Sequence, residues 1–536
     1  MKTLTGLICL SLLLASSAFP FQEHHHALTE QEIGSVHFTT SCSKDVEVSF
    51  NRAVALLHSF QYEQTRDAFR AVADRDPQCA MAQWGIAMSY YHGLWGNSDM
   101  VAGRAALKKA QDLAASNAKT STHDRAYIDA LAEIYREDEK DGSAHARAFE
   151  QRMGALQAAY PSDIEAAIFH ALTLAITAPK TDTTFANQKK CGEILEPIFT
   201  RQPHHPGIAH YIIHCYDNPV LAEKGLGAAR TYAKIAPASA HANHMPSHLF
   251  TRVGSWDESI ASNLRSAELA AQAEGTSLNG EARDQRLHAM DYLEYAYLQS
   301  GRVKQAKAVL DEMNSLPSIQ GLSLTGNYGA AAIPARLSLE LGNWEQASAL
   351  KPLSNAVPWA QAITWMALGV GSAQSGNLEK ARQAQTMLAT LRDQSAKIDA
   401  YWSSQIEVQR REVEASIAEK SGKHADAVQM MRSAADLEES MDKHAVTPGA
   451  IIPAREMLAA LLAEKQPQNA LTEYEAVLKT APGRFNALYG AATTAEAVGN
   501  KAAANRYFQK LTEFAVGDER PELVTARKKV AVTASK

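Results

Sequence analysis

Two short segments of the chain each carry a pair of histidines four residues apart. HPGIAHYIIHCYDN contains His210 and His214, and HANHMPSHLFTRVG contains His244 and His248. Residues with this spacing share one face of a helix, so each pair could offer two imidazole nitrogens to one ligand. Imidazole nitrogen binds zinc, copper and iron, and the spacing therefore predicts a divalent transition-metal site. Corresponding members of the two pairs are 34 residues apart.

A pattern around glycine indicates the elements that carry these pairs. Apolar residues on both sides of each glycine keep a helical period, so the glycine is expected to end one helix. A small residue five positions later lets the next helix pack closely, and such helix pairs must stack to bury their apolar faces. The pattern occurs at 253–262, 300–309, 341–350, 375–384, 421–430 and 498–507, with alanine at the later position in all but the first, where Ser259 replaces it.

This pattern resembles the tetratricopeptide repeat (TPR), a helix-turn-helix unit, over most of the chain after about residue 46. The resemblance implies an all-α fold, a TPR-like α-solenoid that forms a right-handed superhelix. It also implies that the first helix of each repeat lines a concave groove. Because the TPR repeats every 34 residues, the two histidine pairs are expected at equivalent positions of neighbouring repeats.

Alignment of the turn glycines extends the set of candidate ligands. With Gly301 matched to Gly254, the segment LHAMDYLEYAYLQSGR brings a further histidine and a carboxylate into the register of His241 and His244. Packed helices lie roughly 8–10 Å apart, so the two histidine pairs are expected to converge on one point. Pro246 interrupts the second pair and either starts its helix late or kinks it. The predicted metal ligands are His210, His214, His244 and His248, with His241, His288 and Asp291 as further ligands or proton carriers.

Two classes of function fit such a site. In a metal-binding protein the imidazoles hold zinc, copper or iron, and an open coordination position would make the protein an enzyme. Asp217 or Asp291 would then be a fifth ligand or would fix the tautomer of a ligand. The alternative is a scaffold whose groove holds a peptide or protein partner, with the histidines packed within the repeats or binding an anionic ligand together with Arg252. The sequence contains no HExxH, GxSxG, Walker or dinucleotide-binding motif.

Composition and the N-terminus indicate the compartment. The chain has 536 residues, 46% of them apolar, and a net charge of −6, so a large core is expected and nucleic acid is not an expected partner. Lys2, the apolar run 7–14 and the small residues 16–18 are typical of a secretory signal peptide. No later segment is apolar for long enough to span a membrane. We therefore expect an exported protein, periplasmic or extracellular, with no membrane span after removal of the signal.

The expected organisation follows from these features. It comprises a signal peptide at 1–18, an N-terminal extended segment at 19–45, an N-terminal TPR-like region with the histidine-rich groove at 46–345, and a C-terminal TPR-like region at 346–536.

Four cysteines remain after the signal peptide, and an oxidising compartment permits two disulfides among them. Of the three possible pairings, Cys42–Cys79 and Cys191–Cys215 are favoured, because each couple flanks one or two helical hairpins. The alternatives are buried free thiols, or Cys215 as a metal ligand beside His214.

Several segments together resemble a family of exported bacterial TPR proteins. They include TSCSKDVEVSFNRAVALLHSF, DPQCAMAQWGIAM, HPGIAHYIIHCYD, HMPSHLFTRVGSWDESI, LHAMDYLEYAYLQSG and MDKHAVTPGAIIPARE. The resemblance spans nearly the whole mature chain and implies the repeat fold, without a reaction or a ligand. The last segment is rich in proline and glycine, and is either a lid or anion-binding turn or, as we expect, a connector in which Arg455 and Glu456 make structural ion pairs.

Overall fold

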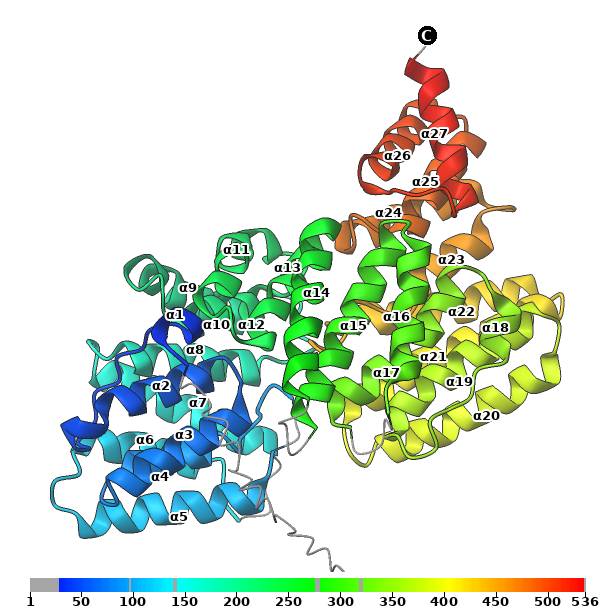
Figure 1. Cartoon of the computed structure of the whole chain (residues 1–536). Helices are drawn as coiled ribbons and strands as arrows, with labels where there is room; N and C mark the ends of the chain where they lie inside the picture. Colours follow the sequence, from blue (N-terminus) through cyan, green and yellow to red (C-terminus); the bar gives the residue numbers. More distant parts are fainter. Residues whose placement is uncertain (1–27, 96–97, 138–141, 275–279, 318–321, 535–536) are drawn as a thin grey trace, which may run out of the picture.

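The computed structural model describes residues 28–95, 98–137, 142–274, 280–317 and 322–534. The regular elements of these residues are all helices, which confirms the predicted all-α class. Helices that follow each other in the chain pack as antiparallel hairpins, and the hairpins stack along the molecule (Figure 1). The predicted signal peptide lies outside the described residues.

The first helices of successive repeats lie side by side, as a TPR-like solenoid requires. α15 (Glu281–Gln299) packs on α17 (Leu324–Glu340), α17 on α19 (Pro358–Gln374), and α19 on α21 (Ala400–Lys420). Each also packs on a second helix of its own hairpin or of the hairpin before it. This is the stacking that the repeat pattern predicts, since single amphipathic helices cannot bury their apolar faces alone.

The six predicted turn glycines all end a helix in the left-handed conformation. Their φ angles lie between 65° and 84°, a region that glycine adopts without the steric cost of a Cβ atom. The small residue five positions after each of them is buried between helices. The glycines are Gly254, Gly301, Gly342, Gly376, Gly422 and Gly499.

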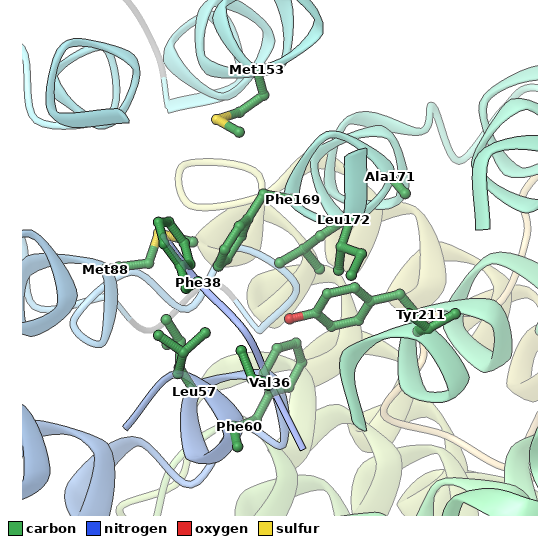
Figure 2. Close-up of a cluster of buried hydrophobic side chains, with 14 of the residues drawn as sticks. Val36, Phe38, Leu57, Phe60, Met88, Met153, Phe169, Ala171, Leu172 and Tyr211 are labelled. Atoms are coloured by element: carbon green, nitrogen blue, oxygen red, sulfur yellow. The ribbon is translucent and has the colours of Figure 1, made fainter. Parts of the chain in front are cut away.

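The N-terminal helices enclose an aromatic core that the extended segment completes. Residues 34–40 have no regular structure, and they insert Val36 and Phe38 among the helices (Figure 2). The Phe38 ring lies 4.9 Å from that of Tyr127 and 5.7 Å from those of Phe50 and Trp84. The elements here are α1 (Glu30–Ile33), η1 (Lys44–Val46), α2 (Glu47–His58), α3 (Tyr62–Arg75), α4 (Ala80–Met88), α5 (Met100–Ser116), α6 (Thr122–Ala132), α7 (Gly142–Ala159), α8 (Ile164–Thr177) and α9 (Ala186–Arg201).

The helices of the middle region carry the predicted site. Pro206 begins α10 at the first helical position, where its missing N–H costs no hydrogen bond. The elements are α10 (Pro206–Tyr216), η2 (Ala222–Gly225), α11 (Leu226–Ile235), α12 (Ala240–His244), α13 (Pro246–Val253), α14 (Trp256–Ala273) and α16 (Val303–Ser315), together with α15 and α17.

The C-terminal helices fold back onto the middle of the array. The Trp256 indole donates a hydrogen bond to the Gly483 carbonyl, and Gln299 accepts one from the Phe485 N–H. Helix packing continues across residue 345, where α18 contacts both α17 and α19. The remaining elements are α18 (Trp344–Ser348), α20 (Leu378–Ser395), α22 (His424–Glu439), α23 (Ala454–Leu462), α24 (Pro467–Thr480), α25 (Phe485–Ala497), α26 (Lys501–Phe514) and α27 (Pro521–Ala534).

Both favoured disulfides are present. Cys42–Cys79 ties the segment before α2 to the start of α4, and Cys191–Cys215 joins α9 to α10. The alternative in which Cys215 is a metal ligand is therefore wrong, because its sulfur is committed to Cys191. No helix of the described ranges combines the length and apolarity that a membrane crossing requires.

Candidate metal centre

Six of the seven predicted ligands form two groups of three histidines. Within each group the three ligand nitrogens lie no more than 4.8 Å from one another. We call them the first and the second triad. The first triad is His210, His214 and His241, and the second is His244, His248 and His288.

The two triads are built in the same way from consecutive repeats. Each takes a pair with four-residue spacing from one first helix and a third histidine from the next. α10 supplies the pair of the first triad and α12 its third member; α12 and α13 supply the pair of the second triad and α15 its third member. His288 occupies the register of His241. The second triad therefore has the same construction as the first and lies one repeat further along the solenoid.

Pro246 starts a helix without separating the second pair. It is the first residue of α13, and His244 is the last residue of α12. Met245 between them has φ −53° and ψ −38°, so the chain keeps a helical course through the junction. His244 and His248 therefore keep one helix face, and their Nε2 atoms lie 3.0 Å apart.

The first triad meets at the Nε2 atom of His210. The Nε2 atoms of His214 and His241 each lie 3.0 Å from it. The other ring nitrogen of His210, Nδ1, lies 2.6 Å from the carbonyl oxygen of His58. A carbonyl only accepts, so Nδ1 carries the proton and the neutral ring turns the Nε2 lone pair toward its two neighbours.

The second triad is held by polar partners behind the rings. His244 donates from Nδ1 to Oδ1 of Asn263 at 2.7 Å, and Asn263 is oriented by its own donation to the Ser259 carbonyl. His248 donates from Nδ1 to Oδ2 of Asp217 at 2.9 Å. Both rings therefore present Nε2 lone pairs to each other. The His288 ring lies 4.2 Å from that of His244, and its Nδ1 has no hydrogen-bond partner in the described structure.

Burial keeps the six imidazoles neutral. It lowers the pKa of His210 to about 3, although the hydrogen bond to the His58 carbonyl opposes the shift. Burial also lowers the pKa of His248, although its hydrogen bond to Asp217 opposes the shift. Neutral imidazole is the form that binds metal. For His214, His241, His244 and His288, burial and the neighbouring imidazoles hold the pKa well below its usual range.

Asp217 orients the ring of His248 from behind the second triad. Arg252 donates from Nε to its Oδ1 at 2.9 Å, and the Lys443 ammonium lies 2.9 Å from Oδ2. Burial opposes ionisation of this carboxyl, but Lys443, Arg252 and His248 together hold its pKa well below its usual range. Asp217 thus contacts Nδ1 of His248 and is not one of the grouped residues; the tautomer-fixing role toward a metal ligand stays a prediction. Arg252 is committed to this carboxylate rather than to an anionic ligand.

The structure does not bring Asp291 to either triad. Its Oδ1 is bonded to the guanidinium of Arg336, and both side chains are fully buried. Glu294 contacts the same guanidinium at 3.3 Å. Asp291 therefore balances a buried charge between α15 and α17, and we leave it out of the candidate ligands.

Two aromatic side chains pack against the triads: Phe60, which the sequence did not single out, and Trp95, which its spacing predicted as a core residue. The Phe60 ring lies 4.4 Å from His210 and 5.4 Å from His241, and Trp95 lies 5.5 Å from His241. Phe60 has φ 53°, a left-handed conformation that costs a non-glycine residue on the order of 1–2 kcal/mol. Phe60 and Trp95 thus pack over the first triad, in which His210 and His241 are buried and His214 is half-buried. The sequence around the histidines contains no signal that predicts their contacts with these aromatic rings.

A third buried group behaves differently. Glu165 accepts hydrogen bonds from Nε2 of His58 at 2.9 Å and Nε2 of His205 at 2.8 Å. Nδ1 of His58 pairs with the Tyr211 hydroxyl at 2.9 Å. The nitrogens here face oxygen partners, whereas the Nε2 atoms in the two triads face each other. This group supports the first triad through the carbonyl of His58.

The predicted connector at 441–458 makes the expected ion pairs. Arg455 pairs with Glu439 and Glu473, and Glu456 with the buried Arg484. The connector also carries Lys443, so it contributes the charge that holds Asp217 ionised.

No protein-family model and no curated protein matches the chain. Among solved structures, a monomeric mutant of IFIT1 with Gppp-AAAA aligns over 89% of this chain and 92% of that chain, with a TM-score of 0.37 and 11% identity. The human IFIT1 dimer with m7Gppp-AAAA aligns over 90% and 92%, with a TM-score of 0.36 and 12% identity. The fold and the site described above rest on the geometry of this chain alone.

Proposed function

We propose that this exported TPR-like protein binds a pair of transition-metal ions, one on each histidine triad. The observation that carries the proposal is the contact between His244 and His248. Both rings donate from Nδ1 to oxygen acceptors, so no hydrogen lies between Nε2 atoms that are 3.0 Å apart. Two lone pairs facing each other in a buried site repel unless a cation lies between them.

A proton is a poor candidate for that cation. An imidazolium would satisfy the contact, but burial lowers the pKa of both rings, and therefore disfavours it. A metal ion uses the same lone pairs without protonation. In a tetrahedral site with metal–nitrogen bonds of about 2.0–2.1 Å, ligand nitrogens lie roughly 3.3 Å apart. The spacing of 3.0 Å in both triads is close to this value.

The donor set favours copper over iron. Non-haem iron sites commonly include a carboxylate, whereas both triads consist of imidazole alone. The ligands are neutral, and the charge of Asp217 is already balanced by Arg252 and Lys443. Two monovalent ions would repel each other about four times less than two divalent ions at the same separation. We therefore propose copper, bound in its monovalent state, with zinc as the alternative.

Elemental analysis of the tag-free mature protein tests this function. We expect two equivalents of copper per chain in the native protein, one in the H244A/H248A variant, and none after H210A/H214A is added. X-ray absorption at the metal edge should show a nitrogen-only first coordination shell, a readout that does not require a variant to fold.

The matched control replaces two exposed histidines, in the variant H37A/H204A, and should retain both equivalents. Equal and substoichiometric metal in all four proteins would reject the metal function. The remaining candidate would then be the scaffold, and the measurement would turn to peptide and protein partners of the repeat array.

A further inference from the structure

A cavity of about 540 Å³ lies between the C-terminal helices and the middle region, and it reaches Thr251 and Arg252 at the end of the helix that carries His248. Its walls include the first helices α17, α19 and α21, α22, and the connector at 441–453, and residues from 180–185, 219–220, 251–252 and 476–481 complete them. Cavities of this size hold small organic molecules. The six triad histidines do not line it, so its occupant is a separate question from the metal.

Aromatic rings form one side of this cavity. Trp359 and Trp402 stack with their ring centroids 4.6 Å apart and their planes 20° apart. Tyr328 lies 6.4 Å from the first ring and 6.2 Å from the second, and Tyr401 lies 5.1 Å from Trp402. Stacked indoles present electron-rich faces, which attract organic cations.

Polar acceptors without donors follow the aromatic rings along α21. Trp402, Gln409 and Glu412 are spaced so that they share one face of the helix, and all three line the cavity. Glu412 is 1% exposed, and its Oε2 atom has no hydrogen-bond partner in the described structure. The Oε1 atom of Gln409 is also buried without one. A buried acceptor left unpaired is costly, so a ligand that donates N–H groups would be stabilised here.

Ion pairing around the cavity leaves two carboxyl groups without a cationic partner. Glu438 on α22 also lines it, and no Lys or Arg of the described chain makes an ion pair with Glu412 or Glu438. The buried cations of the cavity are each paired with other carboxylates: Arg252 and Lys443 with Asp217, and Arg455 with Glu439 and Glu473. Two further cavity residues, Lys180 and Lys479, are exposed to solvent.

When no cation is bound, protonation of Glu412 and Glu438 removes the negative charge that no basic side chain balances. Burial, aided by the charge of Glu438, raises the pKa of Glu412 well above its usual range. Burial likewise raises the pKa of Glu438 to about 7. A bound cation would replace that proton with several charge-assisted hydrogen bonds.

We infer that this cavity binds a small organic cation with a primary ammonium or guanidinium group. The cationic head donates to Glu412 and Gln409, and its carbon chain lies along Trp359 and Trp402. The inference does not depend on the proposed metal function, because none of the six triad histidines lines the cavity; Arg252 and Lys443 line it and also pair with Asp217 behind the second triad.

Isothermal titration calorimetry with agmatine and with cadaverine tests the inference. At least one of the two should bind saturably. Tetramethylammonium, which has no N–H donor, should bind at least about tenfold more weakly than the better of the two amines, and glutarate, which is anionic, should not bind. The E412Q variant should weaken binding about tenfold or more, because the charged hydrogen-bond acceptor is lost.

The matched control is E414Q on the same helix, where Glu414 pairs with Arg410 outside the cavity. It should bind like the native protein, as should the metal-deficient H244A/H248A variant. Lack of saturable binding by both amines would overturn the inference, and so would equal weakening in E412Q and E414Q. Circular dichroism of each variant shows whether the fold is retained. Quenching of the tryptophan fluorescence of the native protein by agmatine gives a readout that needs no variant.

Discussion

The Nε2 atoms of His210 and His241 lie 3.0 Å apart, although the two residues belong to different repeats. α11 packs on both α10 and α12, and this arrangement brings His241 of α12 to the histidine pair on α10. The equivalent histidine of the next repeat, His288, completes the second triad. Each triad is therefore shared between two repeats, and neither repeat contains a complete site.

This sharing predicts the effect of removing each third histidine. The H241N variant should lose one metal equivalent and keep the other, and H288N should do the same for the second triad. Two imidazoles hold a metal much less tightly than three, and asparagine keeps a polar side chain in the buried position. Metal content after dialysis against a chelator measures the result. Loss of both ions in either single variant would show instead that the two triads act as one inseparable site.

Replacement of Asp217 should weaken the second triad alone. In D217N the acceptor for the Nδ1 proton of His248 loses its charge, and the loss of such a partner typically lowers metal affinity about 10–100-fold. Competition titrations with a chromophoric chelator should resolve one weakened and one unchanged ion. D442N is the control, because Asp442 contacts Arg252 but none of the histidines. A uniform loss at both triads would contradict the role assigned to Asp217.

The two disulfides should differ in their effect on metal binding. They close loops with sequence separations of 37 and 24 residues, and the chain-entropy account assigns each about 3–4 kcal/mol of stability. Both C42A/C79A and C191A/C215A should therefore melt at lower temperature. Only the second should also weaken metal binding, because Cys215 lies on α10 next to His214. Equal metal affinity in the two variants would show that α10 is positioned without its disulfide.

His123 should give the protein a stability that decreases at high pH. The neighbouring carboxylates of Asp124, in an ion pair, and Asp163, through a hydrogen bond, raise its pKa from 6.5 to about 9. A raised pKa means that the stabilisation is fully present below pH 6.5 and is lost as the pH rises through about 9. At pH 6 the free energy of unfolding of the native protein should exceed that of H123Q by on the order of 2 kcal/mol. The difference should shrink toward zero above pH 9. A difference that stays constant with pH would refute the assignment.

Features that depend on near neighbours in the chain could be predicted from the sequence. The turn glycines at Gly254 and Gly301 fix where helices end, because a left-handed residue there is a local requirement. The four-residue spacing of His244 and His248 fixes a shared helix face, and it survives the proline between them. The disulfide Cys191–Cys215 follows from two helices of one hairpin.

Features that depend on how repeats pack were decided only by the tertiary structure. The sequence matched His210 with His244 by register and led us to expect one convergent site, whereas the packed helices divide the histidines into two triads. Helix-to-helix distance and loop length set which imidazole reaches which pair, and neither is encoded by residue spacing within a helix. The same holds for Asp291. Its register suggested a metal ligand, but its carboxylate forms an ion pair with Arg336 on α17.

The sequence by itself determined the helical repeats, the register of the histidines and the residue types that can bind metal, because these follow from local backbone preference and side-chain chemistry. The tertiary structure decided the membership of each triad, the partners such as Asp217 and Asn263 that fix the ring tautomers, and the burial under Phe60. These properties arise from contacts between segments far apart in the chain, where small differences in packing determine which atoms meet.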